Sequence, residues 1–162
     1  MPHYKVVCGR ILTRDDKVVS NIRTLKPGTV CTSSWGLLFT STSLTEVNNV
    51  KKYVQTKTFR ALVRCLGEDG VIAVSPYRFS LVPIQDFTAQ SDIDWYKSLT
   101  EIDQQLYQKY GLTTDEIQYI ESTIKSLDTP ELDNLKLDIS GIQYTGQDAA
   151  AAYINQLVNN QN

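Results

Sequence analysis

The side chains of this chain that could do chemistry are few, and their spacing does not assemble a catalytic centre. Asp15-Asp16 and Glu68-Asp69 are adjacent carboxylates, whereas a metal-dependent nuclease needs carboxylates that converge on one cation. Adjacent side chains point apart in an extended chain, so both pairs are interpreted as turn residues. The single histidine, His3, lies near the N-terminus and is a poor base for a serine or cysteine nucleophile.

Motifs for nucleotide or methyl-group chemistry are missing as well. The sequence contains no G-x-G-x-x-G turn and no Asn/Asp-Pro-Pro-Tyr/Phe segment, and Lys26-Pro-Gly-Thr29 lacks the preceding glycines of a P-loop. We therefore expect no catalytic residue and no cofactor, so that the chain is not an enzyme by itself. A small Mg²⁺-dependent nuclease that uses Asp86 is the minor alternative.

The three cysteines do not form a metal or disulfide pattern. Cys8, Cys31 and Cys65 are odd in number and widely spaced, without a Cys-x-x-Cys pair. They are expected to be buried small apolar residues, and no metal site is predicted.

Length and composition indicate one ordinary domain. The chain has 162 residues, of which 41% are hydrophobic, enough for a core. It has no long apolar run and no apolar leader at the N-terminus, so we expect a soluble, cytoplasmic protein without a membrane partner.

Charge is divided unevenly along the sequence. Residues 1–88 carry 12 Lys and Arg against 6 Asp and Glu, and residues 89–162 carry 4 against 12. A basic first half favours a polyanionic partner, although opposed halves can also attract each other within one fold.

Strand and helix signals predict an α+β fold in which a small mixed or antiparallel sheet packs on one long helix. Extended segments are expected over residues 4–12, 18–25, 30–32, 36–40, 71–74 and 79–82. Pro27-Gly28 has the residues of a type II turn. The capping pattern Ser43-x-x-Glu46 opens the long helix, which is expected to continue to Gly67.

The second half is expected to be helical and acidic. One helix is predicted over residues 92–105, with Trp95 on its apolar face and a stop at Gly111. Thr113-x-x-Glu116 is a capping pattern that opens a further helix. Residues 1–88 are thus predicted to form an α+β recognition-type domain. Residues 89–128 would be a helical hairpin packed on it, and residues 129–162 a linker with a short helix over 148–158.

Five segments, in the same order along the chain, resemble the C-terminal part of type II restriction–modification enzymes that contain a fused adenine-specific DNA methyltransferase. The first three are Lys5-Val-Val, the Ile22–Cys31 stretch and Val50-Lys-Lys-Tyr-Val-Gln-Thr-Lys-Thr-Phe-Arg60. The other two are Phe79-Ser-Leu-Val-Pro-Ile-Gln-Asp-Phe87 and the stretch from Leu106 to Glu121. In that family the region is associated with target recognition and lies downstream of the chemistry.

The resemblance implies a non-catalytic module that recognises double-stranded DNA. Lys and Arg would neutralise phosphates, and loop side chains would reach base edges. The predicted DNA contacts are Arg10, Arg14, Lys17, Arg23 and Arg78 from loops and strand ends, with Lys57 and Arg60 as backbone contacts. One departure is the segment over residues 92–105, which the family replaces by a shorter Trp-containing stretch.

The alternative is a protein-interaction or adaptor subunit, bacterial or phage-encoded. It would dock a methyltransferase, a restriction subunit or another large assembly through the acidic helical region. Aromatic side chains suit such an interface, and the candidates are Tyr96, Tyr107, Tyr110 and Tyr119.

Overall fold

The computed structural model describes residues 3–9, 18–19, 21–66 and 79–127. Several predictions lie outside these residues: the basic residues Arg10, Arg14, Lys17 and Arg78, the strand over 71–74, and everything predicted for 129–162. Contacts group Met1–Leu127 into one compact unit, to which all the described residues belong.

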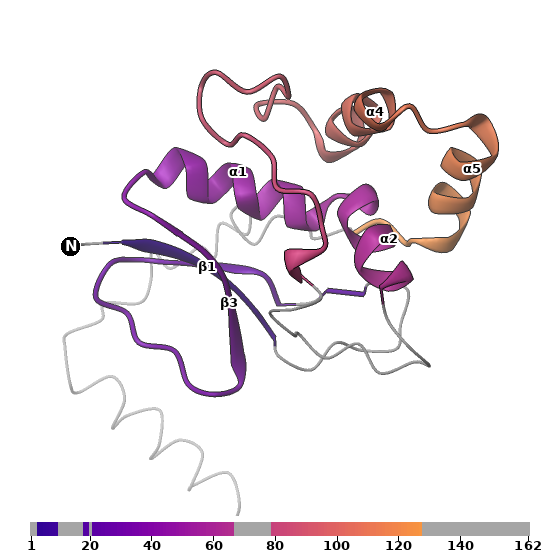
Figure 1. The fold of residues 1–162 in the computed structure, drawn as a ribbon. Coiled ribbons are helices and arrows are strands. Elements are labelled where there is room, and N and C mark those ends of the chain that lie inside the picture. Colours follow the sequence, from indigo (N-terminus) through magenta and orange to yellow (C-terminus); the bar gives the residue numbers. More distant parts are fainter. Residues whose placement is uncertain (1–2, 10–17, 20, 67–78, 128–162) are drawn as a thin grey trace, which may run out of the picture. The chain divides into compact units, whose positions relative to one another are not determined.

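Three antiparallel strands form a sheet in the order β2-β1-β3. β1 spans Tyr4–Gly9, β2 spans Arg23–Leu25 and β3 spans Trp35–Ser41. Figure 1 shows helix α1 lying across one face of this sheet, with the other helices beyond it. The predicted α+β class with a small antiparallel sheet is therefore confirmed.

Two predicted strands are shorter than expected or do not form. Among the described residues of the 18–25 segment only β2 is a strand, because Val18 and Asn21 have positive φ angles of 59° and 54°. Left-handed backbone interrupts an extended segment. Residues 30–32 form no strand, and Val30 is 90% exposed.

The turn at Pro27-Gly28, directly after β2, has the predicted form. Gly28 has φ 82°, which suits glycine at the third position of a type II turn, and the Thr29 amide donates to the Lys26 carbonyl at 3.3 Å.

A β-bulge divides β3 between the two faces of the sheet. Val6 pairs with Phe39 but Val7 pairs with Leu37, so Leu38 is the extra residue on β3. Leu38 and Phe39 both line a cavity beside α1. Side chains alternate along a strand, so Val7 and Leu37 belong to the opposite face, called here the outer sheet face.

The long helix predicted after Ser43 is instead two helices. α1 spans Leu44–Gln55 and α2 spans Lys57–Cys65, with Thr56 between them in extended conformation at ψ 151°. Thr56 ends α1 through its own amide and begins α2 through its side chain, which accepts from the Phe59 amide at 3.1 Å. The apolar periodicity of the sequence continues across Thr56, so it does not indicate that the helix is broken there.

The capping pattern before α1 is only half formed. Ser43 Oγ accepts from the Glu46 amide at 3.3 Å, as predicted. The Glu46 carboxylate accepts from the Ser41 hydroxyl at 2.7 Å rather than from the Ser43 amide.

The segment between α2 and the next long helix contradicts two predictions. Phe79 and Ser80 are helical rather than extended, and the Val82 amide donates to the Phe79 carbonyl at 3.2 Å. Residues 83–98 contain neither helix nor strand, so the predicted helix does not begin at residue 92. Trp95 is buried from within this irregular segment.

α4 spans Leu99–Tyr110 and α5 spans Thr114–Thr123. Both begin with complete capping boxes, Ser98 with Glu101 and Thr113 with Glu116. Gly111 ends α4 in the left-handed conformation at φ 61°, as glycine does after a helix.

The elements form three layers within this unit. α1 contacts all three strands on one side and α2 and α4 on the other, and α2 also contacts α5. The core lies on both sides of α1 and contains Val6, Val47, Tyr53, Phe87 and Trp95. No helix among the described residues is long and apolar enough to cross a membrane.

Candidate functional site

The outer sheet face brings basic side chains together beside an aromatic ring. Arg23 on β2 pairs with Val7, and Lys5 pairs with Leu25, so Lys5 and Arg23 lie on the same face. The Arg23 guanidinium lies over the Trp35 ring at 5.1 Å from its centroid, and the Arg23 side chain is exposed. This stacking fixes the orientation of the cation without neutralising it.

Leu37 extends this surface, and Lys26 lies in the adjoining turn. Lys26 is exposed directly after β2, and Leu37, opposite Val7, is 57% exposed. The Lys5 ammonium donates to the Thr29 carbonyl at 2.8 Å and so holds the turn beside the strand. On the outer sheet face Arg23 and Leu37 are thus exposed and Lys5 and Trp35 are partly exposed, whereas Val7 between them is buried.

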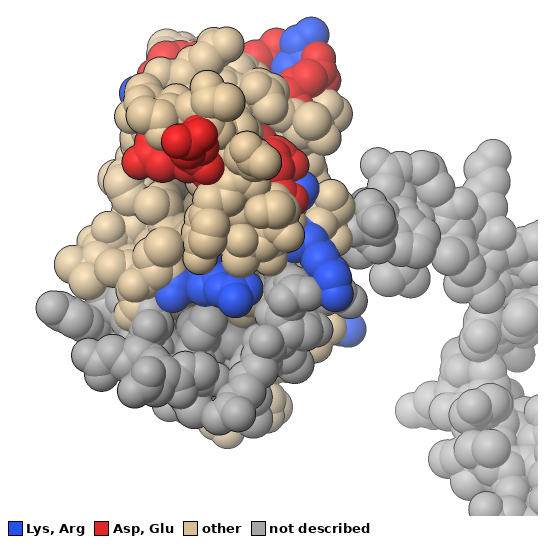
Figure 2. Space-filling model, turned by 90° about the vertical axis from the view of Figure 1, so that its right-hand side faces the viewer, with Lys and Arg blue, Asp and Glu red and all other residues tan. Residues whose placement is uncertain are grey.

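Charge is segregated among the described residues. Between residues 3 and 66, eight described residues are Lys or Arg and only Glu46 is acidic. Between residues 79 and 127, three are Lys and eight are Asp or Glu. Figure 2 views the side that carries α5, with acidic side chains over its upper part and basic ones below them.

Arg60 was predicted to contact the DNA backbone, and that prediction is wrong. Arg60 is 1% exposed, its Nε donates to the Thr56 carbonyl at 3.1 Å, and its Nη1 donates to the Lys125 carbonyl at 2.7 Å. Burial lowers the pKa of Arg60, and the nearby Asp103 opposes that shift. The i, i+3, i+7 spacing of basic residues on α2 therefore does not make an exposed stripe, because α4 and α5 pack over Arg60.

Lys57 is also committed to a contact inside the protein. Its ammonium lies 2.6 Å from a Glu121 carboxylate oxygen and 3.3 Å from the Glu121 carbonyl oxygen. Its side chain is 16% exposed, so Lys57 joins α2 to α5 and is a poor phosphate ligand.

Asp103 on α4 is the partner of the first turn of α2. Its carboxylate accepts from the Lys57 amide at 3.0 Å, the Thr58 amide at 2.8 Å and the Thr58 hydroxyl at 2.6 Å. Burial raises the pKa of Asp103, and the hydrogen bonds from Thr58 and Lys57 oppose that rise. The carboxylate occupies the positive end of a helix, so this buried cluster holds the helices together.

The Lys57–Glu121 pair is expected to make stability fall in acid. Burial raises the pKa of Glu121, but hydrogen bonds from Lys57 and Tyr107 outweigh it, so the pKa lies below the ordinary 4.5. A lowered folded-state pKa stabilises the protein above the unfolded-state value, and this stability is lost as the pH falls through the folded-state value.

Glu121→Gln tests this expectation. It should cost about 1 kcal/mol or less at neutral pH, because the side chain is partly exposed, and the cost should shrink towards about pH 3. Urea unfolding at both pH values measures it. Asp115→Asn is the control, since the Asp115 carboxylate has no hydrogen bond or ion pair to the residues that the structure describes. An effect of Glu121→Gln that stays constant with pH would contradict the expectation.

The four tyrosines predicted to bind a partner do not share one role. Tyr107 is 2% exposed and donates to a Glu121 carboxylate oxygen at 2.9 Å. Tyr110 accepts at its hydroxyl from the Gln85 amide at 2.6 Å. Tyr96 and Tyr119 are 85% and 59% exposed, so they alone of the four present most of their side chain to a partner.

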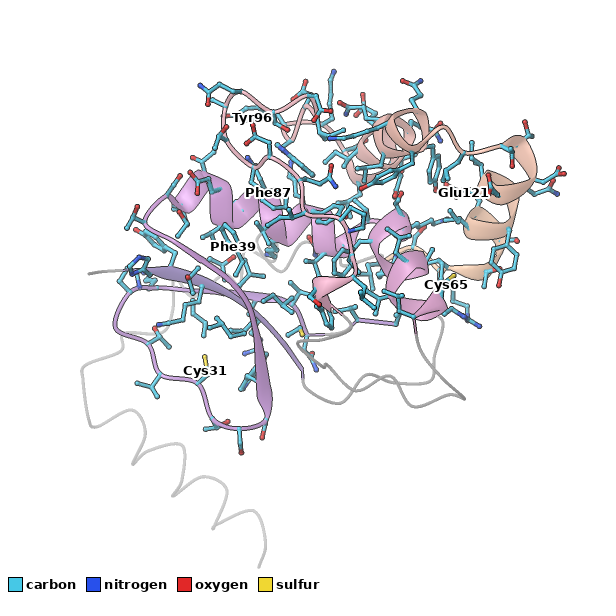
Figure 3. All side chains as sticks on the ribbon, in the orientation of Figure 1. Cys31, Phe39, Cys65, Phe87, Tyr96 and Glu121 are labelled. Atoms are coloured by element: carbon cyan, nitrogen blue, oxygen red, sulfur yellow. The ribbon has the colours of Figure 1, made fainter. Side chains whose placement is uncertain are left out.

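The cysteines also differ from one another. Cys8 is buried as predicted, whereas Cys31 is half-buried and Cys65 is exposed, so the expectation fails for these two. Figure 3 shows Cys31 and Cys65 far apart, Cys31 in the loop before β3 and Cys65 at the end of α2. Within the described ranges, no group of His, Cys, Asp and Glu could hold a metal ion.

Sequence reasoning found Arg23 but missed what surrounds it. Two signals could have indicated that Trp35 lies near Arg23. One is the alternation of β1, which places Lys5 and Val7 on one face, and the other is the β2–β3 connection. Asp103 was missed because its acceptor role depends on a contact 45 residues away in the sequence.

The comparisons with known proteins leave the resemblance untested. No protein-family model, curated protein or solved structure matches this chain.

Proposed function

We propose that this chain is a non-catalytic recognition module that binds double-stranded DNA through the outer sheet face. The observation that carries the proposal is the exposed Arg23 stacked on Trp35, with Lys5 on the same face and the exposed Lys26 in the turn directly after β2. The charge segregation supports it, because a strongly basic surface attracts the phosphate backbone and an acidic one repels it.

The proposed mechanism separates positioning from readout. Lys5 and Lys26 act as point charges on phosphates, and the release of counterions makes affinity fall steeply with salt. The planar guanidinium of Arg23 can bind a phosphate or a guanine edge through two hydrogen bonds. Stacking on Trp35 reduces the conformational freedom that Arg23 would lose on binding.

The resemblance of the five segments to restriction–modification enzymes supports the same class of function. In the proposal, Arg60 and Lys57 no longer contact DNA, because their side chains are held within the protein. Arg10, Arg14, Lys17 and Arg78 stay predicted contacts that lie outside the described residues.

Docking of another protein is the second candidate. The exposed rings of Tyr96 and Tyr119 favour it, as does the acidic surface over α4 and α5. Aromatic side chains of this kind are enriched at protein interfaces. A methyltransferase or restriction subunit would be the partner in this case.

The test of DNA binding is charge reversal on the outer sheet face. Arg23→Glu with Lys26→Glu should weaken binding to a fluorescent duplex at about 50 mM salt by more than about tenfold. The dependence of log affinity on log salt should also become shallower by about two, because two phosphate contacts are lost. Fluorescence anisotropy over a salt series measures both quantities.

The matched control reverses the same charge on the acidic side. Lys97→Glu with Lys125→Glu alters net charge equally, and both side chains are exposed. It should change the affinity by less than about threefold. An equal loss in both variants would overturn the outer sheet face as the site. Wild-type protein without affinity for duplex, or with a preference for single strands, would reject the DNA function; protein docking would then be the supported reading.

A further inference from the structure

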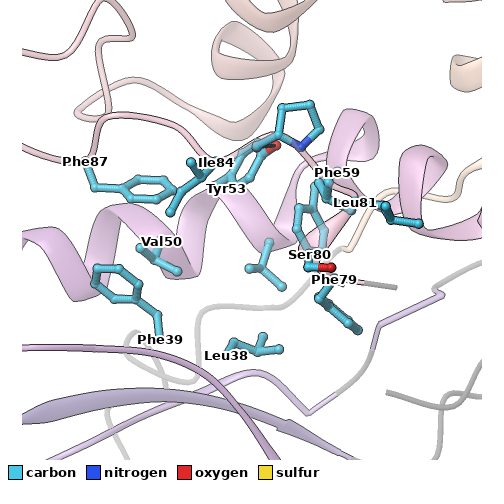
Figure 4. A pocket seen from close by; sticks show the side chains of 13 residues that line it. Leu38, Phe39, Val50, Tyr53, Phe59, Phe79, Ser80, Leu81, Ile84 and Phe87 are labelled. Carbon is cyan, nitrogen blue, oxygen red and sulfur yellow. Dashed lines mark hydrogen bonds between the residues drawn. The ribbon is translucent and has the colours of Figure 1, made fainter. Parts of the chain in front are cut away.

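An apolar cavity of about 450 Å³ lies on the opposite side of β3 from the outer sheet face. Its walls come from four parts of the chain (Figure 4): Leu38 and Phe39 of β3, Val50 and Tyr53 of α1, Phe59 of α2, and residues 79–84 with Phe87. Ordinary packing leaves few voids larger than a water molecule, whose share of liquid volume is about 30 Å³. The cavity, which is open to solvent on one side, is much larger than such packing defects.

Aromatic rings form much of the cavity wall. Tyr53 and Phe59 meet edge-to-face at 5.0 Å between centroids, and Phe59 and Phe79 lie 5.8 Å apart. On the other side, Phe39 and Phe87 are in T-shaped contact at 5.8 Å. Rings held by one another in this way make a rigid wall, which costs little conformational entropy when a ligand binds.

The polar groups of the wall do not face an ionic ligand. The Tyr53 hydroxyl donates to the Pro83 carbonyl at 2.8 Å, so its hydrogen-bonding capacity is used by the protein. The described lining contains no Asp, Glu, Lys, Arg or His. A charged group placed here would lose its hydration without a partner, so the buried part of any ligand must be uncharged.

The entrance is marked by exposed side chains of the 79–87 segment. Leu81 is 50% exposed and Ile84 is 81% exposed. Ser80, which precedes Leu81, is exposed as well. Apolar side chains of this size that face solvent around a cavity are typical of a binding site.

We propose that this cavity binds an uncharged apolar small molecule, an aryl or alkyl group whose polar end, if it has one, points out past Ser80. The volume lies within the range of about 300–1,000 Å³ found for small-molecule sites. A small molecule fits better than a partner protein, because a hollow of about 450 Å³ leaves room only for a group of this size. The site is separate from the outer sheet face, so this proposal can be tested independently of DNA binding.

The test uses two neutral probes, 2-naphthalenemethanol and 1-decanol, with the whole chain. Methyl NMR should show saturable shifts at Leu38, Val50, Val54, Leu81 and Ile84, and not at Val6, Val7 or Val47, which lie in the core or on the other side of the sheet. The melting temperature should rise with probe concentration, because a ligand that binds only the folded state stabilises it.

Two variants probe the site in different ways. Val50→Phe fills the cavity from its α1 wall and should weaken probe binding at least tenfold. Leu81→Lys places a charge at the entrance and should have the same effect; because Leu81 is half exposed, this variant folds even if Val50→Phe does not. Leu44→Lys, an equally exposed leucine on α1 that does not line the cavity, should leave binding unchanged.

The outcomes are distinct. Shifts confined to the lining methyls, lost in Leu81→Lys and kept in Leu44→Lys, support the proposal. Absence of saturable shifts for both probes, shifts spread over the core, or equal effects of the two lysine variants would overturn it. None of these results depends on whether duplex DNA binds.

Discussion

Asp103→Ala should lower the free energy of unfolding by about 3–5 kcal/mol, the range expected when one member of a buried charged cluster is removed. The substitution leaves the Lys57 amide, the Thr58 amide and the Thr58 hydroxyl without their acceptor. It also removes the negative charge that stabilises the buried Arg60 guanidinium. A loss of this size is a large fraction of the total stability of a typical domain.

Controls separate this cluster from surface charge. Asp115→Ala removes an exposed carboxylate from the first turn of α5 and should cost no more than about 1 kcal/mol. Asp103→Ala combined with Arg60→Met should cost less than the sum of the two single substitutions, since the two groups are electrostatically coupled. Urea unfolding followed by circular dichroism measures the four variants against the wild type. If Asp103→Ala costs no more than Asp115→Ala, the carboxylate is not the acceptor that stabilises α2.

Trp95→Ala should cost about 3–5 kcal/mol, as truncation of a buried aromatic side chain does. Trp95 is 3% exposed, and its ring packs on Phe87 at 5.3 Å and on Tyr53 at 6.0 Å between centroids. Its indole N–H donates to the Asp86 carbonyl at 2.9 Å and to the Ser91 hydroxyl at 3.0 Å. The residue therefore attaches an irregular segment to α1.

Two neighbouring variants sort the contributions to this effect. Trp95→Phe keeps most of the ring contact but removes the hydrogen bonds to the Asp86 carbonyl and the Ser91 hydroxyl. The Ser91 oxygen still accepts from the Ile93 amide, so about 1–3 kcal/mol should be lost, mainly at the Asp86 carbonyl. Tyr96→Ala, next in sequence and 85% exposed, should change stability by less than about 0.5 kcal/mol. Thermal and urea unfolding give the values. The prediction is falsified if Trp95→Ala and Tyr96→Ala have equal effects.

Features set by a few neighbouring residues were predictable from the sequence. The turn at Pro27-Gly28, the capping box of Thr113 and the stop at Gly111 each depend on local backbone geometry, and each occurs where the pattern placed it. The true start of α4 was equally visible, because Ser98-x-x-Glu101 matches the same capping pattern. The predicted start at residue 92 followed the apolar spacing of Trp95 instead, and that spacing reflects burial in a loop.

Features set by distant contacts were not predictable. The break at Thr56 interrupts a continuous apolar pattern, and the carboxylate that stabilises the second helix comes from Asp103. Arg60 has the spacing of a surface residue on α2 and is buried only because α4 and α5 cover it. Spacing along one helix cannot show which of its faces another helix will cover.

The same limit applies to the candidate site. Arg23 was identified by its charge, but its value as a ligand comes from Trp35, which reaches it only when β3 pairs with β1. The apolar cavity needs β3, α1, α2 and the 79–87 segment together, so no single stretch of sequence indicates it.

The cap that Asp103 supplies has a consequence for the order of folding during synthesis. A nascent chain that has left the ribosome only as far as residue 98 contains both α1 and α2, but not the acceptor for the first amides of α2. A nine-residue helix is marginal in isolation. We expect α2 to be protected from hydrogen exchange only after α4 has emerged. The progress of translation would then determine when α2 becomes stably folded.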